Sequence, residues 1–598
     1  MLGRRTFQML LKPKNFSART LGTAKPPNSD SGNLNMTKVV CTLGPSTEAA
    51  GPVNKLVTEG MSVARLNFSH VMDYSEPLAK LELVREAHGT HGKMGWAGAP
   101  PNLRAVMVDT KGPEIRTGTL PGGLSELTIE DGSEVVLTYE DVSGDPPPAE
   151  GDSSALRLHV DYQDLAATVV EGGSVLLDDG LITLQVQKRD IATKTVWCAA
   201  LNSGPIKARK GVNLPGATLT LPALTAKDRQ DLQWAVGVGA DFVAASFIRS
   251  AANVRSIVAF LERSCDEVAA SGKPRPMRPL VISKIESQEG VDNYSEILEA
   301  SDGIMVARGD LGVEIPFEKV FAAQKMMIRE ANAAGKPVIV ATQMLDSMMR
   351  QPRPTRAEVT DVGAAVMDGA DAVMLSGETA AGKYPIQALK AMVSIVKEAD
   401  AIVDDAEKQS LAERNLRLRL AHEGLTSSHP SNYPGQRSDA EMSAVAAAAV
   451  NAAEHLDAKL IIAITETGAV ARAIARSRPS VPVVAFCFSP AVARRLQLHR
   501  AVHPLLMTAP SSKGDGQGSG DSAVLGLGDN VAGFGEQGGR VRAVSLSMLR
   551  QEAARTAKEL GWVKAGERVV IVDRNNAKGV GATDAIKSGT NLKVFTVV

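Results

Sequence analysis

The sequence predicts an α/β protein: a (β/α)8 barrel, a small β-barrel lid domain inserted in one of its loops, and an open α/β domain at its end. Three observations predict this fold class. A unit of β-branched strand, polar turn and helix recurs from Lys38 onward. Short alternating strands, rich in Gly, Asp and Val, interrupt the pattern over 119–215. After Asp400 an Ala-rich helix and new strands follow, as in an open α/β sheet.

The expected barrel strands are short apolar segments that end in polar or charged residues, which suits a barrel with its site at the carboxyl ends of the strands. They span 38–43, 61–68, 103–109, 240–247, 279–286, 303–309, 336–343 and 370–377. An open doubly wound sheet is the alternative. The segment CTLGPST after the first strand lacks the second and third glycines of that fold's phosphate-binding turn, which favours the barrel.

The domain boundaries follow from these changes in pattern. We expect a basic leader over 1–36, the barrel over 37–118 and 216–400, the inserted lid domain over 119–215, and a C-terminal regulatory α/β domain over 401–598. A stretch dense in Gly and Ser near 511–539 predicts a flexible insertion. The inserted domain would cover the active face of the barrel.

Composition excludes several classes of function. Hydrophobic residues make up 44% and charged residues 22% of the chain, as in ordinary globular proteins. A net charge of −1 offers no broad basic surface for nucleic acid. No apolar run approaches the ~20 residues that cross a bilayer, so we expect no membrane span. The four cysteines are far apart, without metal or redox spacing, which favours a reducing compartment.

The first 29 residues carry six Lys and Arg residues and no acidic residue. This pattern resembles an organelle transit peptide, which would place the protein in a mitochondrion or plastid. The alternative is a disordered basic leader on a cytoplasmic enzyme.

Lys284, Glu286 and Asp310 lie at the ends of two expected strands that one amphipathic helix separates. Side chains alternate between the faces of a strand, so Lys284 and Glu286 emerge on the same face. Carboxylate oxygens beside a fixed cation suit Mg²⁺-assisted phosphoryl or enolate chemistry. The alternative is a set of ion pairs that only decorates the strand ends.

Other expected strands end in side chains that suit an anion or a cation. An arginine can hold phosphate through two parallel hydrogen bonds, and clustered hydroxyl, amide and carboxylate oxygens suit a monovalent or divalent cation. Taken singly, such an arginine is more often part of a surface ion pair and such a threonine is more often structural. The residues at these strand ends are Arg65, Asn67, Ser69, Asp109, Thr110, Thr342 and Ser376.

Taken together, the motifs TKVVCTLGPST, MSVARLNFSH, DTKGPEIRTG, ISKIES, GIMVARGDLGVEIP, KPVIVATQML and DAVMLSGETAAGKYP resemble the pyruvate kinase family. The resemblance runs in order from Thr37 to Asp400 and continues more weakly to Val598. It implies transfer of phosphate from phosphoenolpyruvate to ADP, giving pyruvate and ATP in the last step of glycolysis. It also implies Mg²⁺ and K⁺ as cofactors and a homotetramer.

The resemblance implies a role for each matching residue. Glu286 and Asp310 would bind Mg²⁺, and Lys284 would lie against the phosphoryl group in flight. Arg65 would hold that phosphate from another side, and the backbone amides of Gly309 and Asp310 would bind the substrate carboxylate at a helix N-terminus.

Thr342 would contact the carboxylate near the path by which the enolate is protonated, and Ser376 would belong to the adjoining water network. The protonating group itself stays open. The K⁺ ligands implied are Asn67, Ser69, Asp109 and the Thr110 carbonyl, and Glu114 is typical of the K⁺-dependent class.

The nucleotide would contact Asn67, His70, Arg116 and the lid residue Lys210. Asp178 is a weaker candidate in the lid, because the pair Asp178 and Asp179 also fits a β-turn.

A phosphorylated effector would bind the turn formed by Thr465, Thr467 and Gly468 in the C-terminal domain. Val470 stands where the family has a further hydroxyl, and Arg574 and Lys578 mark the second effector loop. A plain strand-to-helix turn is the alternative.

Two other functions are alternatives to phosphoryl transfer to ADP. One is another Mg²⁺-dependent phosphoenolpyruvate or enolate enzyme on a similar barrel, which should lack the inserted lid with its nucleotide lysine. The other is a catalytically silent scaffold, which should have lost Lys284, Glu286, Asp310 or Thr342, and all four are present.

Overall fold

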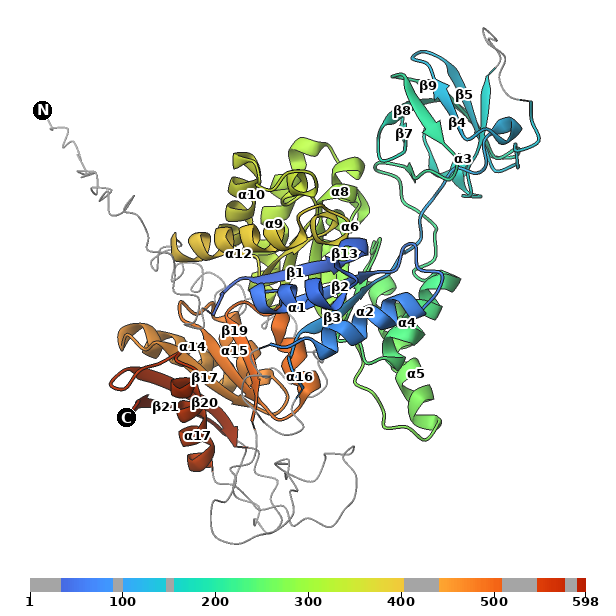
Figure 1. The fold of residues 1–598 in the computed structure, drawn as a ribbon. Coiled ribbons are helices and arrows are strands. Elements are labelled where there is room, and N and C mark those ends of the chain that lie inside the picture. The colour runs from blue at the N-terminus through green and yellow to red at the C-terminus, as the bar shows by residue number, and fades with distance from the viewer. Residues whose placement is uncertain (1–33, 90–99, 147–154, 403–439, 508–545, 576–588) are drawn as a thin grey trace, which may run out of the picture.

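A computed structural model describes residues 34–89, 100–146, 155–402, 440–507, 546–575 and 589–598. The basic leader up to residue 33 and the expected insertion near 511–539 lie outside the described residues. Within the described ranges, no helix has the length and apolar character needed to span a membrane. Figure 1 shows a central barrel, a small sheet domain that stands away from it, and a third unit packed against the opposite end.

Eight parallel strands close into the barrel, in the order β1-β16-β15-β14-β13-β12-β3-β2. All eight strands expected from the sequence are present, most of them shortened at their polar ends. Their bounds are β1 Lys38–Leu43, β2 Val63–Asn67, β3 Ala105–Asp109, β12 Phe242–Ala245, β13 Leu280–Ile285, β14 Gly303–Ala307, β15 Val338–Ala341 and β16 Ala372–Leu375.

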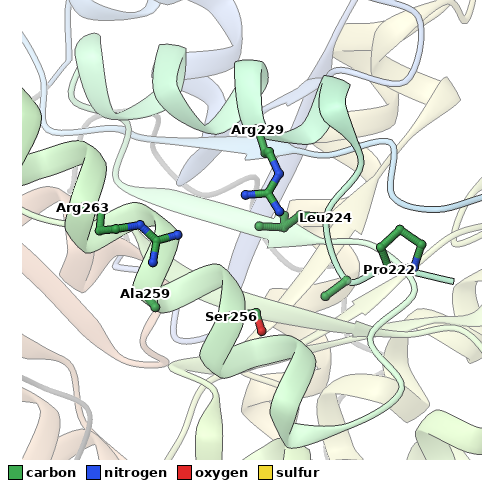
Figure 2. Close-up of a pocket in the computed structure, with 7 residues that line it drawn as sticks. Pro222, Leu224, Arg229, Ser256, Ala259 and Arg263 are labelled. Atoms are coloured by element: carbon green, nitrogen blue, oxygen red, sulfur yellow. The ribbon is translucent and has the colours of Figure 1, made fainter. Parts of the chain in front are cut away.

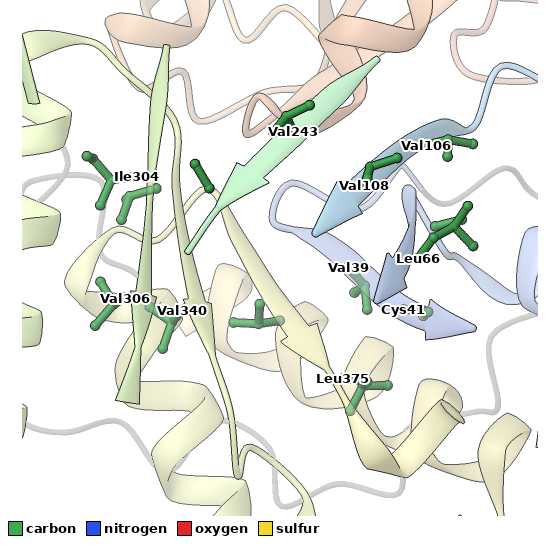
Figure 3. Close-up of a cluster of buried hydrophobic side chains, with 14 of the residues drawn as sticks. Val39, Cys41, Leu66, Val106, Val108, Val243, Ile304, Val306, Val340 and Leu375 are labelled. Carbon is green, nitrogen blue, oxygen red and sulfur yellow. The ribbon is translucent and has the colours of Figure 1, made fainter. Parts of the chain in front are cut away.

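Helices surround the barrel and bury the outward face of each strand. Because side chains alternate along a strand, Val39 and Cys41 pack against helices while Val40 fills the interior. Figure 3 shows the outer layer, with Val108 and Val340 among its strand residues. The larger helices are α1 Ala50–Glu59, α2 Ser75–Glu86, α4 Ala226–Gly237, α5 Ala251–Ala270, α9 Val320–Ala334, α10 Arg356–Asp368 and α12 Pro385–Ile402.

The prediction of a single helix after Glu286 is wrong. Two short helices, α6 Gln288–Asp292 and α7 Tyr294–Ala300, replace it and meet at Asn293. The Asn293 side chain donates a hydrogen bond to the Arg249 carbonyl (2.8 Å), which ties the break to the loop after β12.

The inserted segment forms a six-stranded sheet, β11-β7-β8-β9-β5-β6, and a two-stranded sheet, β10-β4, around one apolar core. The strands are β4 Glu126–Ile129, β5 Glu134–Thr138, β6 Leu156–His159, β7 Ser174–Leu177, β8 Ile182–Asp190, β9 Thr195–Ala200, β10 Gly204–Lys207 and β11 Val212–Asn213. Asn213 donates to Glu314 of the short barrel helix α8, Arg308–Glu314 (2.7 Å). This contact holds the base of the sheet domain beside the carboxyl ends of the barrel strands.

The C-terminal unit is an open sheet of order β19-β18-β17-β20-β21, as the sequence predicts. Its strands are β17 Leu460–Thr465, β18 Val483–Cys487, β19 Val502–Leu506, β20 Arg568–Asn575 and β21 Gly589–Thr596, and its main helices are α14 Ala440–His455, α15 Ala469–Arg476, α16 Pro490–Arg495 and α17 Leu546–Glu559. Leu498 from this unit joins the apolar cluster inside the barrel, so the unit closes the barrel's amino end.

Three aspartates line that amino end, directly before alternate strands. Asp241 precedes β12, Asp302 precedes β14 and Asp371 precedes β16, and each accepts a backbone N–H from a neighbouring strand, at 2.9, 2.8 and 3.1 Å. Two arginines of the C-terminal unit complete the pairing: Arg494 bonds Asp241 (2.8 Å) and Arg478 bonds Asp371 (3.0 Å).

Candidate active site

Lys284, near the end of β13, is the centre of the charge cluster at the carboxyl end of the barrel. Its ammonium lies 2.9 Å from Glu286 Oε1 and 3.1 Å from Asp109 Oδ1, and it donates to Ser246 Oγ (2.8 Å). All four side chains are buried. The alternation predicted from the sequence therefore brings Lys284 and Glu286 together, and β3 supplies a second carboxylate.

Asp109 links Lys284 to the second cation of the site. Arg65 Nε donates to Asp109 Oδ2 (2.6 Å), while Arg65 Nη1 donates to the hydroxyl of Thr42 (2.9 Å). One carboxylate thus fixes two cations in place, and a charged hydrogen bond of this kind is stronger than a neutral one. Two positioned positive charges at the mouth of the barrel are suited to a phosphoryl group.

Burial and neighbouring charge shift the pKa of these groups in different directions. Burial raises the pKa of Asp109, but Arg65 and Lys284 outweigh it and hold that pKa below its usual value. Burial lowers the pKa of Lys284, but Asp109 and Glu286 together outweigh burial and hold that pKa above its usual value. The lysine is therefore charged. Burial, with Asp310 nearby, raises the pKa of Glu286 to about 7 against the opposing effect of Lys284.

Glu286 and Asp310 are the pair that could hold a metal. Glu286 accepts from Lys284 and from the backbone N–H of Phe247 (2.5 Å), and Asp310 is half-buried on α8 without a hydrogen bond or ion pair among the described residues. In the described part of the chain, no group of three or more His, Cys, Asp or Glu residues could hold a metal ion. Two carboxylates completed by substrate oxygens suit Mg²⁺.

Thr342 lies in a strained turn directly after β15. Thr342 and Gln343 have φ angles of 69° and 54°, the left-handed region that residues with a Cβ seldom adopt. Arg308 holds the turn, donating to the Thr342 carbonyl (2.7 Å) and to Asp361 (2.7 Å). The backbone N–H of Gly309 donates to Thr342 Oγ1 (2.7 Å), so the threonine occupies one of the amides expected to bind a carboxylate. The helix α8 begins at Arg308, before the glycine.

Ser376 follows β16 and carries an unused polar atom. Its hydroxyl is buried and has no hydrogen-bond partner among the described residues, while its backbone N–H donates to Glu378 (2.7 Å). Glu378 is buried and also accepts from the Leu345 amide (3.0 Å). A buried hydroxyl without a partner fits the water network expected beside Thr342.

The oxygens expected to bind K⁺ already accept hydrogen bonds within the protein. Asn67 Oδ1 accepts from the Ser69 hydroxyl (2.9 Å), and the Thr110 carbonyl accepts from Ser246 (2.7 Å). Asp109 bonds the two cations described above. Asn67 Oδ1 also accepts from the Ser69 backbone N–H (3.2 Å), so of these oxygens the Thr110 carbonyl, with its second lone pair, has the most room for a monovalent cation.

The expected nucleotide contacts are spread over the barrel mouth and the sheet domain. Arg116 is paired with Glu114 (2.5 Å), so Glu114 faces a cation of the chain itself. Lys210 bonds Asp178 (2.9 Å), whereas His70 and Asn67 are exposed.

The turn at Asp178 and Asp179 lies close to the carboxylate of Asp310. Both residues have positive φ, 52° and 56°, and the Leu181 amide donates to the Asp178 carbonyl (3.1 Å), which is a β-turn. Burial, then Asp310 and Asp178, raise the pKa of Asp179. The turn interpretation is therefore correct, and the turn also faces Asp310.

The expected effector turn is a strand-to-helix connection. Thr465 ends β17 and is buried, Thr467 is exposed, and Gly468 (φ 82°) precedes α15. Arg472 donates to the Thr467 carbonyl (3.1 Å). Lys578 and the side chain of Arg574 lie outside the described residues.

Sequence reasoning missed four contributors to the site. Ser246 and the Phe247 amide bind Lys284 and Glu286, Thr42 supports Arg65, and Arg308 holds the turn at Thr342. Their position was a usable signal, since Thr42, Ser246 and Arg308 all stand at the carboxyl ends of barrel strands.

Comparisons with known proteins agree on one family. A family model described as pyruvate kinase, barrel domain, matches residues 34–389, and one described as pyruvate kinase, alpha/beta domain, matches 443–524. Pyruvate kinases of Staphylococcus saprophyticus and Staphylococcus aureus are each 42% identical over 473 residues, which is 79% of this chain and 72% of theirs. The crystal structure of a pyruvate kinase from Cryptosporidium parvum is similar with a TM-score of 0.76 and 34% identity, over 94% of this chain and 97% of that one.

Proposed function

The chain belongs to the pyruvate kinase family, and we propose that the charge cluster around Lys284 transfers the phosphoryl group of phosphoenolpyruvate to ADP. The activity is that of a phosphotransferase. The observation that supports the site is a chain of ion pairs. Asp109 pairs with both Arg65 and Lys284, and Lys284 also pairs with Glu286.

Lys284 is proposed to stabilise the phosphoryl group between donor and acceptor. Transfer proceeds with charge on the phosphoryl oxygens and little covalent help from the protein, so a fixed cation acts mainly by position. Burial and three hydrogen-bonding neighbours restrict the ammonium, which reduces the reorganisation needed during the reaction. Arg65, fixed by Asp109 and Thr42, would bind the same phosphate from a second direction.

Glu286 and Asp310 are proposed to hold Mg²⁺ together with oxygens of the substrate. When bound, the metal supplies positive charge that stabilises the enolate left by the departing phosphoryl group. Asn67, Ser69, Asp109 and the Thr110 carbonyl would hold K⁺, a second charge near the phosphate.

Thr342 and Ser376 are proposed to act after transfer, when the enolate takes up a proton at carbon. Thr342 Oγ1 receives the Gly309 N–H and itself donates to the Ala341 carbonyl (2.6 Å), so its position is fixed. The hydroxyl of Ser376, which has no hydrogen-bond partner in the part of the chain that the structure describes, would bind water at the same end of the barrel. Substrate carboxylate would compete with Thr342 for the amide of Gly309.

Arg116, Lys210 and His70 are proposed to bind ADP as the sheet domain closes over the barrel. Lys210 would leave Asp178, and Arg116 would leave Glu114, to bind phosphate oxygens of the nucleotide.

The family resemblance supports three further proposals. They are a homotetramer, a phosphorylated effector at Thr465, Thr467 and Gly468, and targeting of the leader to an organelle. Light scattering, effector titration and a fluorescent fusion of residues 1–36 would test them.

A coupled assay of pyruvate formation tests the function directly. The native chain should form pyruvate from phosphoenolpyruvate only when ADP and Mg²⁺ are both present, and replacing K⁺ with an inert cation should lower the rate. Pyruvate formation that is independent of ADP would point to a phosphatase instead. An equal rate without K⁺ would reject the potassium site alone.

A further inference from the structure

A cavity of about 350 Å³ lies on the outside of the barrel, between α4 and α5, away from the charge cluster. Its apolar lining comes from Pro222, Ala223 and Leu224, which lead into α4, and from Ala259 on α5. Figure 2 shows Arg229 extending from α4 and Arg263 from α5 toward the space between the two helices. Cavities of this size suit small ligands.

Both arginines are held in place without a counter-charge. Their guanidinium carbons lie 5.4 and 5.9 Å from the centre of the same ring, that of Phe260, which is 9% exposed. Cation–π contacts of this kind orient a guanidinium while leaving its N–H donors available. In the described part of the chain neither arginine has a side-chain hydrogen bond or an ion pair. Glu262, next to Arg263 in sequence, is bound by Arg275 and Arg278.

The wall opposite α5 is fixed by a separate set of contacts. Arg249 donates to the carbonyls of Leu219 (2.8 Å) and Leu221 (2.5 Å), and Thr225 caps α4 through a reciprocal pair of hydrogen bonds with Asp228. These contacts hold the segment from Leu219 to Thr225, which connects the sheet domain back to the barrel. Hydrogen bonds to another part of the barrel therefore hold the wall of the cavity that leads into α4.

From this arrangement we infer a second ligand site, which takes a small molecule with an anionic group on a flat apolar body. The two guanidinium groups would bind a phosphate or carboxylate, and the apolar wall at Pro222, Leu224 and Ala259 would cover the body of the ligand. Both guanidinium groups line one cavity, and two such cations favour a doubly charged anion. Neither arginine belongs to the phosphoryl-transfer site, so the two sites share no residue.

Calorimetric titration with phenyl phosphate tests the inference, because this probe carries both features. The titration is made on the full chain with saturating phosphoenolpyruvate and Mg²⁺ and without ADP, so that the phosphoenolpyruvate position is filled and no turnover occurs. We expect a binding event that is weakened roughly tenfold or more in the Arg229→Gln, Arg263→Gln double variant. Arg255→Gln, an exposed arginine of α5 outside the cavity, is the matched control and should bind as the native chain does.

Two further measurements keep the inference falsifiable. Ala259→Trp should fill the cavity and abolish binding while both arginines remain. Inorganic phosphate and benzyl alcohol, which carry one feature each, should bind more weakly than phenyl phosphate. Equal affinity of phenyl phosphate for the native chain and the double variant would overturn the site. Inorganic phosphate binding as tightly as phenyl phosphate would overturn the ligand class.

Discussion

Both ends of the barrel bury charge, and they differ in how completely that charge is paired. At the amino end, Asp241, Asp302 and Asp371 each combine a backbone N–H with an arginine. At the carboxyl end, the described contacts leave Asp310 without a partner and the Ser376 hydroxyl without a hydrogen bond, and they concentrate two cations on Asp109. A saturated buried charge stabilises a fold, whereas an incompletely paired one can accept a ligand.

Among variants that keep Lys284, the largest effect is expected from the two carboxylates proposed to hold the metal. In the Glu286→Gln, Asp310→Asn double variant, kcat should fall roughly 10³-fold, because the charge that stabilises the enolate is lost. Steady-state assays across a range of Mg²⁺ concentrations measure this. Asp292→Asn, a carboxylate at the end of α6 away from the cluster, is the control and should keep native kcat. Full activity of the double variant would remove the metal assignment.

The amino end should respond in stability rather than in rate. Replacing Arg478 by Met leaves the buried Asp371 without its arginine, and breaking a buried pair in this way costs about 3 kcal/mol. The urea concentration at the midpoint of unfolding should therefore drop. The value of kcat at 25 °C should stay near that of the native chain. Lys459→Met, which removes an exposed pair with Asp457, is the control and should leave the midpoint in place. A large loss of kcat in a folded Arg478→Met protein would erase the distinction between the two ends.

A smaller loss is expected for Ser246→Ala. This change removes one of the hydrogen bonds that hold the Lys284 ammonium, and hydrogen bonds to charged groups contribute about 1.5–3 kcal/mol, so kcat should fall roughly tenfold or more. Ser246→Thr keeps the hydroxyl and should recover part of the rate. If alanine and threonine behaved alike, Ser246 would have no positioning role.

The smallest effect, measured per pH unit, is a pH dependence of stability at the amino end of β1. Burial lowers the pKa of Lys38 to about 7, with Arg104 and Arg500 adding to the shift and Asp400 opposing it. The unfolded chain therefore binds more protons than the folded chain between about 7 and the ordinary value of 10.5, so stability from this group rises with pH over that window. The slope is at most about 1.4 kcal/mol per pH unit.

Comparison of the native chain with Lys38→Met isolates this contribution. The difference between their free energies of unfolding should change over pH 7–10.5 and be flat below it. A difference that is the same at every pH would show that Lys38 titrates normally in the folded protein.

The barrel, and the two strands β13 and β14 that lead to Glu286 and Asp310, could be predicted from the sequence. Each barrel strand is a short β-branched run whose last residues are polar, so both the fold and the Lys284, Glu286 and Asp310 cluster follow from local pattern. The break at Asn293 could not be predicted, since it depends on a hydrogen bond to Arg249 in another loop.

The ion pairs between the barrel's amino end and the C-terminal unit could not be predicted from the sequence either. Arg478 and Asp371 are 107 residues apart, and Arg494 and Asp241 are 253 apart, so only the docking of the C-terminal unit brings them together. The role of Ser246 was hidden for a related reason: its partners Asp109 and Lys284 belong to the strands on either side of its own.

The central claim is that Lys284 acts on the phosphoryl group during transfer rather than on substrate binding. Single-turnover kinetics of Lys284→Met, combined with direct titration of phosphoenolpyruvate in the presence of Mg²⁺, separates the two. We predict that the transfer rate falls roughly 10³-fold or more while the Kd for phosphoenolpyruvate changes less than about tenfold. An unchanged transfer rate, or a loss that lies wholly in substrate affinity, would contradict this account.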